Sequence, residues 1–114
     1  MPYEPEYTKR FLRDLKRYAS LRKQVKKQIQ RILEDPFASS KLLTKRRTDW
    51  RGKHSQRTTR DFRLFFAVCD ECLKRSFKRK GYNACVGCEK TGSDNTVIFL
   101  AFGTHSIYDE EPPI

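Results

Sequence analysis

At 114 residues, with 37% hydrophobic and 34% charged side chains, the chain suits a single domain with a compact core. No apolar run approaches the roughly 20 residues of a membrane-spanning helix, and no apolar segment of a secretion signal follows the first residues, which predicts a soluble, cytoplasmic protein. The formal net charge of +11 is spread over many lysines and arginines, which suits a polyphosphate partner better than a small acidic ligand.

Two short amphipathic helices are predicted in the N-terminal third of the chain. Residues 3–7 form a first strand or an irregular lead-in, and Thr8 then has the position and side chain of a helix N-cap. Apolar residues recur at helical spacing, as Phe11, Leu15 and Tyr18 and then as Leu21, Val25, Ile29, Ile32 and Leu33. Ser20 is a candidate cap for the second helix, which ends at Asp35-Pro36. So short a link predicts an antiparallel helical hairpin packed on a sheet.

The remaining elements are predicted to be strands. Residues 37–49 are typical of a loop, and residues 50–58 of a polar strand. Residues 62–68 alternate, with Arg63 on the face opposite the core side chains. Residues 96–102 are apolar on both sides, as in a central strand. This order predicts an α+β fold with an antiparallel sheet.

All four cysteines lie between the last two predicted strands, as the pairs Cys69-x2-Cys72 and Cys85-x2-Cys88. Two such pairs supply the four thiolates of a closed, structural zinc site, whose metal is a scaffold and not a catalyst. We therefore predict a Zn²⁺-binding module at residues 69–90, inserted in a single domain of residues 1–114. The insert has no core of its own, so metal binding would supply its folding energy. Disulfides or free thiols are the alternative, and a reducing cytosol disfavours disulfides.

The basic residues are distributed unevenly. Residues 9–34 carry ten basic and two acidic side chains, whereas the last seven residues include three acidic ones. The loop between Cys72 and Cys85 carries five basic residues and no acidic one: Lys74, Arg75, Lys78, Arg79 and Lys80. Phe77 and Tyr82 lie among these basic residues, and their aromatic rings are expected either to stack on nucleic-acid bases or to pack over the metal. The pattern favours nucleic acid or the ribosome as partner; an acidic protein alone and a merely solvated surface are the alternatives.

Three sequence fragments, in order behind the basic hairpin, resemble the RelE/ParE toxin superfamily. They are Trp50-Arg-Gly-Lys53, Arg57-Thr-Thr-Arg-Asp-Phe-Arg63-Leu-Phe-Phe, and Gly103-Thr-His-Ser-Ile-Tyr108-Asp. The resemblance covers nearly the whole chain apart from the cysteine insert, where the family has a plain β-turn. It implies a RelE-like α+β domain, a toxin of a type II toxin–antitoxin system, and a cognate antitoxin that covers the basic surface.

In this superfamily, RelE-type members enter the ribosomal A site and cut mRNA, whereas ParE-type members inhibit DNA gyrase. The resemblance favours a ribosome-associated endoribonuclease that inhibits translation by cleaving mRNA through 2′-OH transesterification. The alternatives are a ParE-like gyrase inhibitor and a non-catalytic, zinc-containing nucleic-acid-binding protein.

Five residues are the candidate catalytic set that the resemblance and the strand pattern indicate. Arg63 and Arg57 would bind the scissile phosphate, or form structural ion pairs. His105 would transfer protons, or cap a turn, and Tyr108 would stack on a base, or close the core. Lys53 would donate positive charge, since Lys53 and Arg57 share one strand face. His54 falls on the other face with Gln56, which makes it a weaker candidate.

Overall fold

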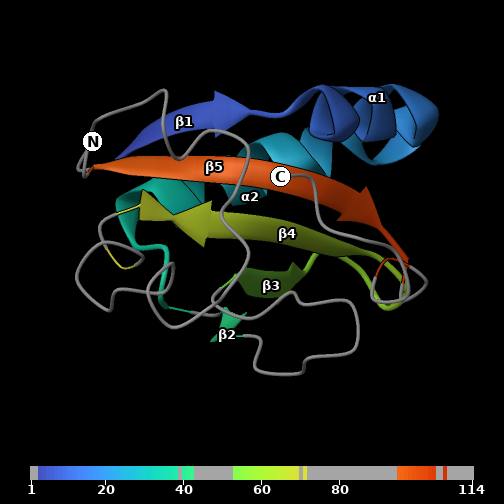
Figure 1. The fold of residues 1–114 in the computed structure, drawn as a ribbon. Coiled ribbons are helices and arrows are strands. Elements are labelled where there is room, and N and C mark those ends of the chain that lie inside the picture. The colour runs from blue at the N-terminus through green and yellow to red at the C-terminus, as the bar shows by residue number, and fades with distance from the viewer. Residues whose placement is uncertain are drawn as a thin grey trace.

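The computed structural model describes residues 3–38, 40–42, 53–69, 71, 95–104 and 107. Its elements are β1 (Glu4–Tyr7), α1 (Lys9–Arg17), the 3-10 turn η1 (Ala19–Leu21), α2 (Arg22–Glu34), β2 (Lys41–Leu42), β3 (His54–Arg57), β4 (Arg63–Val68) and β5 (Thr96–Gly103). The strands form one five-stranded sheet in the order β1-β5-β4-β3-β2 (Figure 1). No helix within these ranges is both long enough and apolar enough to cross a membrane.

The sheet is mixed, so the prediction of a purely antiparallel sheet was wrong. β1 lies at the edge and runs parallel to β5, from Glu4 opposite Thr96 to Tyr7 opposite Phe99. The other neighbouring strands are antiparallel. Pro5 is tolerated in β1 because an edge strand needs hydrogen bonds on one side only. The strand pattern could not predict this pairing, since alternation specifies a face and not a neighbour or a direction.

Helix α1 begins directly after its predicted N-cap, whereas α2 begins at Arg22, two residues after its predicted cap. The Thr8 hydroxyl accepts a hydrogen bond from the Phe11 backbone N–H at 3.0 Å, which confirms the predicted N-cap. Ser20 is not a cap; it lies inside η1, and the N-cap position of α2 is Leu21, which makes no side-chain cap bond. The 3-10 turn continues directly into α2, so no separate cap is needed.

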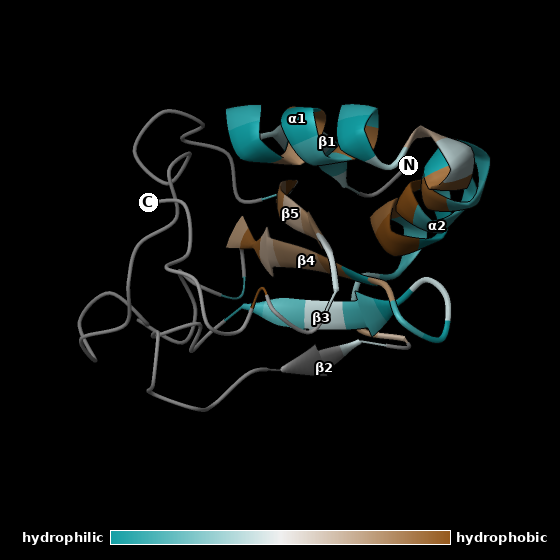
Figure 2. Ribbon diagram, turned by 90° about the vertical axis from the view of Figure 1, so that its right-hand side faces the viewer, coloured by the Kyte–Doolittle hydropathy of each residue, from teal (hydrophilic) through white to brown (hydrophobic). Residues whose placement is uncertain are grey.

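The helices pack on one face of the sheet, which we call the helix face. Phe11 of α1 and the apolar stripe of α2 join residues of the two central strands in one buried cluster, in which Phe66 and Phe99 are fully buried. Figure 2 shows β4 and β5 as hydrophobic strands and β3 as a largely hydrophilic one. A second buried cluster, which includes Phe65 and Leu100, lies on the other face. The two central strands are therefore covered on both sides.

Helix α1 also completes the edge of β5 beyond the end of β1. Thr8 donates to the Phe99 carbonyl at 3.1 Å through its backbone N–H, and to the Leu100 carbonyl at 2.8 Å through its hydroxyl. The Phe102 N–H donates to the buried Asp14 carboxylate at 3.0 Å. These bonds satisfy backbone groups that would otherwise be buried without partners, which fixes α1 against the C-terminal half of β5.

Candidate functional site

The structure places Arg57 and Arg63 directly opposite each other on paired strands. Arg57 ends β3 and Arg63 begins β4, and Gly103 of β5 lies opposite Arg63 on its other side. Residues opposite each other in an antiparallel pair project to the same face. In β4, Leu64 belongs to the helix-face cluster and Phe65 to the cluster on the other face. Arg63 lies two residues before Phe65 and therefore projects to the same face as Phe65. Both arginines thus lie on the face turned away from the helices. We call this the arginine face.

The arginine pair is electrostatically incomplete among the residues that the structure describes. Arg57 is exposed and Arg63 is half-buried. The Nε atom of Arg63 is buried and has no hydrogen-bond partner among the described residues. Like charges opposite each other destabilise a sheet, and a buried N–H without a partner costs roughly 1–3 kcal/mol. An anion such as a phosphate would relieve both.

Lys53 is not brought together with the arginine pair. It directly precedes β3 and is only 2% exposed. Three residues lie between it and Arg57, and four steps along an extended chain correspond to about 13 Å at the usual rise of a β-strand. Lys53 and Arg57 share the parity of the arginine face, as expected, but the two side chains belong to opposite ends of β3.

His54 belongs to the helix face, as its position in the strand predicts. Its ring stacks on Phe66 with the centroids 5.4 Å apart, and the residue is 3% exposed. Gln56 points to the same side, because its side chain bonds to Gln28 of α2. His54 is therefore separated from the arginine pair by the sheet and does not contribute a proton there.

Gln28 is a site-supporting residue that the sequence analysis missed. It is 2% exposed, and its Nε2 donates to Gln56 Oε1 at 2.7 Å and lies 3.3 Å from the Arg57 carbonyl oxygen. The Thr58 hydroxyl donates to Gln28 Oε1. These bonds hold the end of β3 that carries Arg57 against α2. The sequence feature that could have identified Gln28 as buried is its position at helical spacing between Val25 and Ile32, on the apolar stripe of the helix.

Thr104 and Ile107, the described residues after β5, lie beside Gly103. The Ile107 N–H donates to the Thr104 carbonyl at 3.1 Å, and Ile107 is 4% exposed. A Cβ atom on Gly103 would lie 2.8 Å from Ile107 Cδ1, so Ile107 packs directly on the residue opposite Arg63. His105 and Tyr108 lie outside the described residues, so their roles stay predictions.

Of the four predicted zinc ligands, the structure describes one. Cys69 directly follows β4 and is 6% exposed, packed with Phe65 and Ala67. Cys72, Cys85 and Cys88 lie outside the described residues, as do the basic loop, Phe77 and Tyr82. Within the described part of the chain no three histidine, cysteine or acidic residues form a group that could hold a metal. The zinc module stays a prediction.

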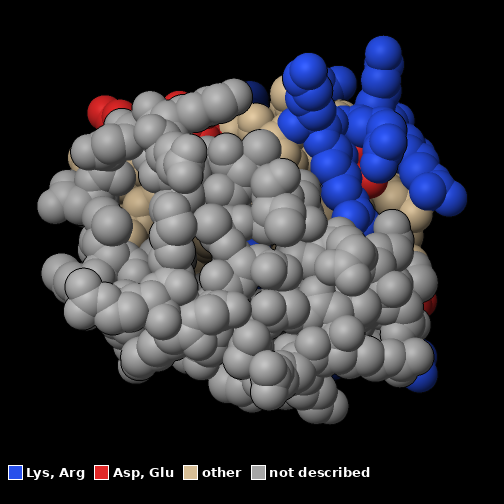
Figure 3. Space-filling model, in the orientation of Figure 1, with Lys and Arg blue, Asp and Glu red and all other residues tan. Residues whose placement is uncertain are grey.

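The helices present a strongly basic surface. Nine of the ten lysines and arginines in residues 9–34 are exposed: Lys9, Arg13, Lys16, Arg17, Arg22, Lys23, Lys26, Lys27 and Arg31. Arg10 is half-buried, with its Nε 3.8 Å from the Asp14 carboxylate. Several of these side chains gather at the upper right of Figure 3, where Figure 1 shows α1. This surface suits an anionic partner.

No protein-family model matches the sequence, and no curated protein matches it significantly. Solved structures do match over nearly the whole chain. YafQ from E. coli has a TM-score of 0.60 and 13% identity, covering 93% of this chain and 97% of that one. The RelBE2 toxin–antitoxin complex from Mycobacterium tuberculosis has a TM-score of 0.60 and 20% identity, with 92% and 100% covered. A YoeB/ParE toxin from Agrobacterium tumefaciens has a TM-score of 0.59 and 17% identity, with 90% and 98% covered.

Identities this low show a common fold and leave activity to be argued from the site. The predicted α+β architecture of two helices on a sheet is confirmed, apart from the direction of β1, and the zinc module inserted between the last two strands stays a prediction. This chain therefore has the fold of the RelBE2 and YoeB/ParE toxins.

Proposed function

We propose that the protein is the toxin of a toxin–antitoxin system and acts in the cytoplasm as a ribosome-associated endoribonuclease on mRNA. The observation that carries the proposal is the arginine pair: Arg57 and Arg63 lie opposite each other, and the buried Nε of Arg63 has no partner among the described residues. Two cations that face each other without a counter-charge among the described residues destabilise the sheet, and a bound phosphate would remove that cost. The fold neighbours support the choice of a toxin.

Cleavage would proceed by attack of the mRNA 2′-oxygen on the adjacent phosphorus atom. The new O2′–P bond forms and the P–O5′ bond breaks, which leaves a 2′,3′-cyclic phosphate and a 5′-hydroxyl. Arg63 and Arg57 would bind the non-bridging oxygens, whose negative charge increases in the transition state. Guanidinium groups suit this role because their planar forks donate two hydrogen bonds at once.

The proton transfers need a group that gains and loses a proton near neutral pH. His105, two residues after Gly103, would take the proton of the 2′-OH or return one to the 5′-oxygen. Tyr108 would stack on a base next to the scissile bond. Lys53, which is 2% exposed at the other end of β3, is too buried to contact the phosphate bound by the arginine pair and has no part in the proposed cleavage.

The basic surface of the helices and the zinc module complete the proposal. The exposed lysines and arginines of α1 and α2 would contact ribosomal RNA, and an acidic antitoxin would cover them in the inactive state. The RelBE2 neighbour, which was solved as a toxin–antitoxin complex, supports an antitoxin partner. Cys69, Cys72, Cys85 and Cys88 would hold one structural Zn²⁺, as their paired spacing favours.

The test is to add the purified protein to translating ribosomes and to map new mRNA ends. We expect new ends with wild type, almost none with Arg63→Ala, and undiminished cleavage with Arg60→Ala. Arg60 is a matched control because it is exposed in the turn between β3 and β4 and carries the same charge. If wild type produced no new ends but inhibited DNA supercoiling, the gyrase alternative would replace the nuclease.

A further inference from the structure

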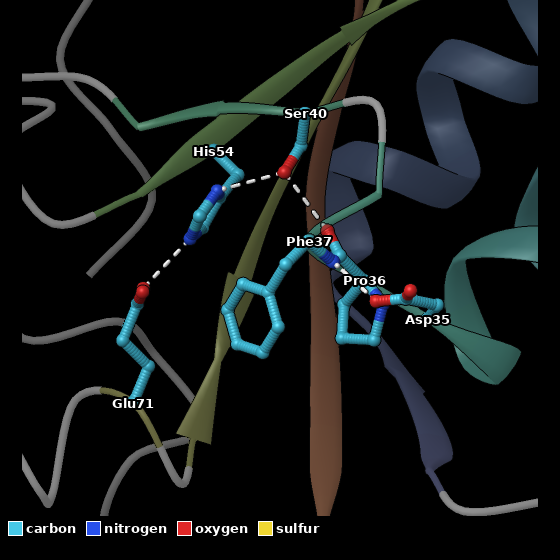
Figure 4. Close-up of polar contacts among 6 residues, drawn as sticks. All are labelled: Asp35, Pro36, Phe37, Ser40, His54 and Glu71. Carbon is cyan, nitrogen blue, oxygen red and sulfur yellow. Dashed lines mark hydrogen bonds and ion pairs between the residues drawn. The ribbon is translucent and has the colours of Figure 1, made fainter.

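His54 joins three segments that are far apart in the sequence (Figure 4). Its Nδ1 lies 3.0 Å from the Ser40 hydroxyl, in the turn after α2, and its Nε2 lies 2.7 Å from Glu71 Oε1. Glu71 is inside the first Cys-x2-Cys pair, between Cys69 and Cys72. The proposed function uses none of the three residues in this network.

The two ring nitrogens of His54 face different segments of the chain. The Ser40 hydroxyl, whose hydrogen is donated to the Pro36 carbonyl at 2.8 Å, lies beside Nδ1, and the Glu71 carboxylate lies beside Nε2. The imidazole therefore bridges the turn after α2 and the cysteine segment. Removing either His54 or Glu71 would remove the hydrogen bond between the sheet and that segment.

The ring is held in place independently of Glu71. It stacks on Phe66, and the Phe37 ring meets it edge-on with the centroids 5.6 Å apart. The turn that carries Phe37 is shaped by Asp35, whose carboxylate accepts from the Phe37 N–H at 3.2 Å. His54 is therefore oriented by the sheet and the turn after α2, and its Nε2 points toward Glu71 (Figure 4).

The combination of serine, histidine and carboxylate does not indicate a hydrolase. The Ser40 hydroxyl hydrogen is donated to a backbone carbonyl, so the histidine does not activate the oxygen as a nucleophile. The ring is also 3% exposed, which leaves no access for a substrate. The network is a structural contact between the sheet and the cysteine segment.

We propose that His54, supported by Ser40, docks the zinc module onto the sheet through Glu71. The inference rests on the zinc-binding part of the proposed function. Because the insert is predicted to lack a core of its own, the Glu71 contact would form together with metal binding. Zinc and the His54–Glu71 contact then stabilise each other, since coupling between two binding events is reciprocal. Metal binding would thereby stabilise β3, which also carries Arg57.

The experiment measures zinc affinity by competition with a coloured chelator. We expect His54→Phe, which keeps an aromatic ring against Phe66, and Glu71→Ala each to weaken zinc binding about ten- to a hundredfold, as for a buried hydrogen bond to a charged group. The double variant should be no weaker than either single one, because both changes remove the same contact. Glu34→Ala, which removes an exposed carboxylate from the end of α2, should bind zinc as wild type does.

Hydrogen exchange of the β3 amides gives a second readout. Removing zinc from wild type should speed exchange in β3, and in His54→Phe the β3 exchange should no longer respond to zinc. Wild-type zinc affinity in both single variants, with β3 still protected by the metal, would overturn the docking role and leave the zinc site standing. A wild-type protein that binds no zinc would overturn the metal site and the docking role together. Neither result would affect the nuclease proposal, which mRNA cleavage tests separately.

Discussion

On β3, Arg57 and His54 are three residues apart and project to opposite faces of the sheet, where their surroundings differ. On the helix face, His54 bonds to Ser40 and Glu71, and Gln56 bonds to Gln28. On the arginine face, Arg57 lies opposite a second cation whose buried Nε has no described partner. A completed polar network stabilises a fold, whereas an incomplete pair of like charges indicates a binding site for an anion.

The largest expected effect is on the arginine face. Arg63→Ala should lower the cleavage rate roughly 100- to 1,000-fold, as for the loss of one donor to a charged transition state. The free energy of unfolding should stay within about 0.5 kcal/mol of wild type, or rise, because no described contact of Nε is lost. Single-turnover cleavage and urea unfolding measure the two quantities. A large loss of stability would mean that Arg63 has a structural partner, and it would contradict the difference in role between the helix face and the arginine face.

The salt dependence of RNA binding distinguishes the two faces in a second way. Each phosphate contact to single-stranded RNA contributes about −0.7 to the slope of log K against log salt. Arg63→Ala should therefore reduce the steepness of the slope by about 0.7, and His54→Phe should leave it unchanged. Fluorescence anisotropy with a short RNA at several salt concentrations provides the measurement. Equal slopes in wild type and Arg63→Ala would argue that Arg63 does not contact phosphate.

A smaller effect is expected where the helix face supports the arginine face. Gln28→Leu should lower the free energy of unfolding by roughly 1–3 kcal/mol, because it leaves Gln56 and Thr58 without their partner. Cleavage should fall less than in Arg63→Ala, since Gln28 contacts only the backbone of Arg57. Gln24→Leu, one turn earlier on α2 and exposed, is the control for helix propensity and should be near neutral. Equal stability of the two variants would exclude a supporting role for Gln28.

The smallest effect is expected at Gly103, beside Arg63. Gly103→Ala should cost about 1 kcal/mol, because the new methyl group meets the flexible end of Ile107 at 2.8 Å and forces that side chain to move. Cleavage should fall a few-fold as the segment after β5 shifts. Adding Ile107→Val removes the crowded Cδ1 atom and should restore most of the activity. No recovery in the double variant would mean that the backbone at Gly103, and not Ile107, is affected.

Much of the fold could be predicted because the signals are local. The Thr8 cap, the apolar stripes and the alternation in β4 follow from backbone geometry over a few residues. The boundaries were less accurate: of the predicted polar strand at residues 50–58, Lys53 and Thr58 lie outside β3, residues 50–52 lie outside the described part of the chain, and β2 appears inside a predicted loop. Polar strands and two-residue strands carry too little hydrophobic pattern to be located from the sequence.

The candidate site was predictable to the extent that strand parity decides which face a side chain occupies. Parity placed Lys53 and Arg57 on one face and His54 on the other, and the contacts of His54 agree. Parity does not give distance along the strand or depth of burial, so it did not indicate that Lys53 is buried at the far end of β3. His105 and Tyr108 remain candidates from the resemblance.

The sequence by itself determined the two helices, the central strands and the opposite faces of β3, since each depends on a repeat of 3.6 or 2 residues. Only the tertiary structure decided that β1 runs parallel to β5, that Gln28 supports the end of β3, and that His54 contacts Glu71. These features join residues distant in the sequence. They depend on which surfaces meet when the chain packs, and no local pattern specifies that.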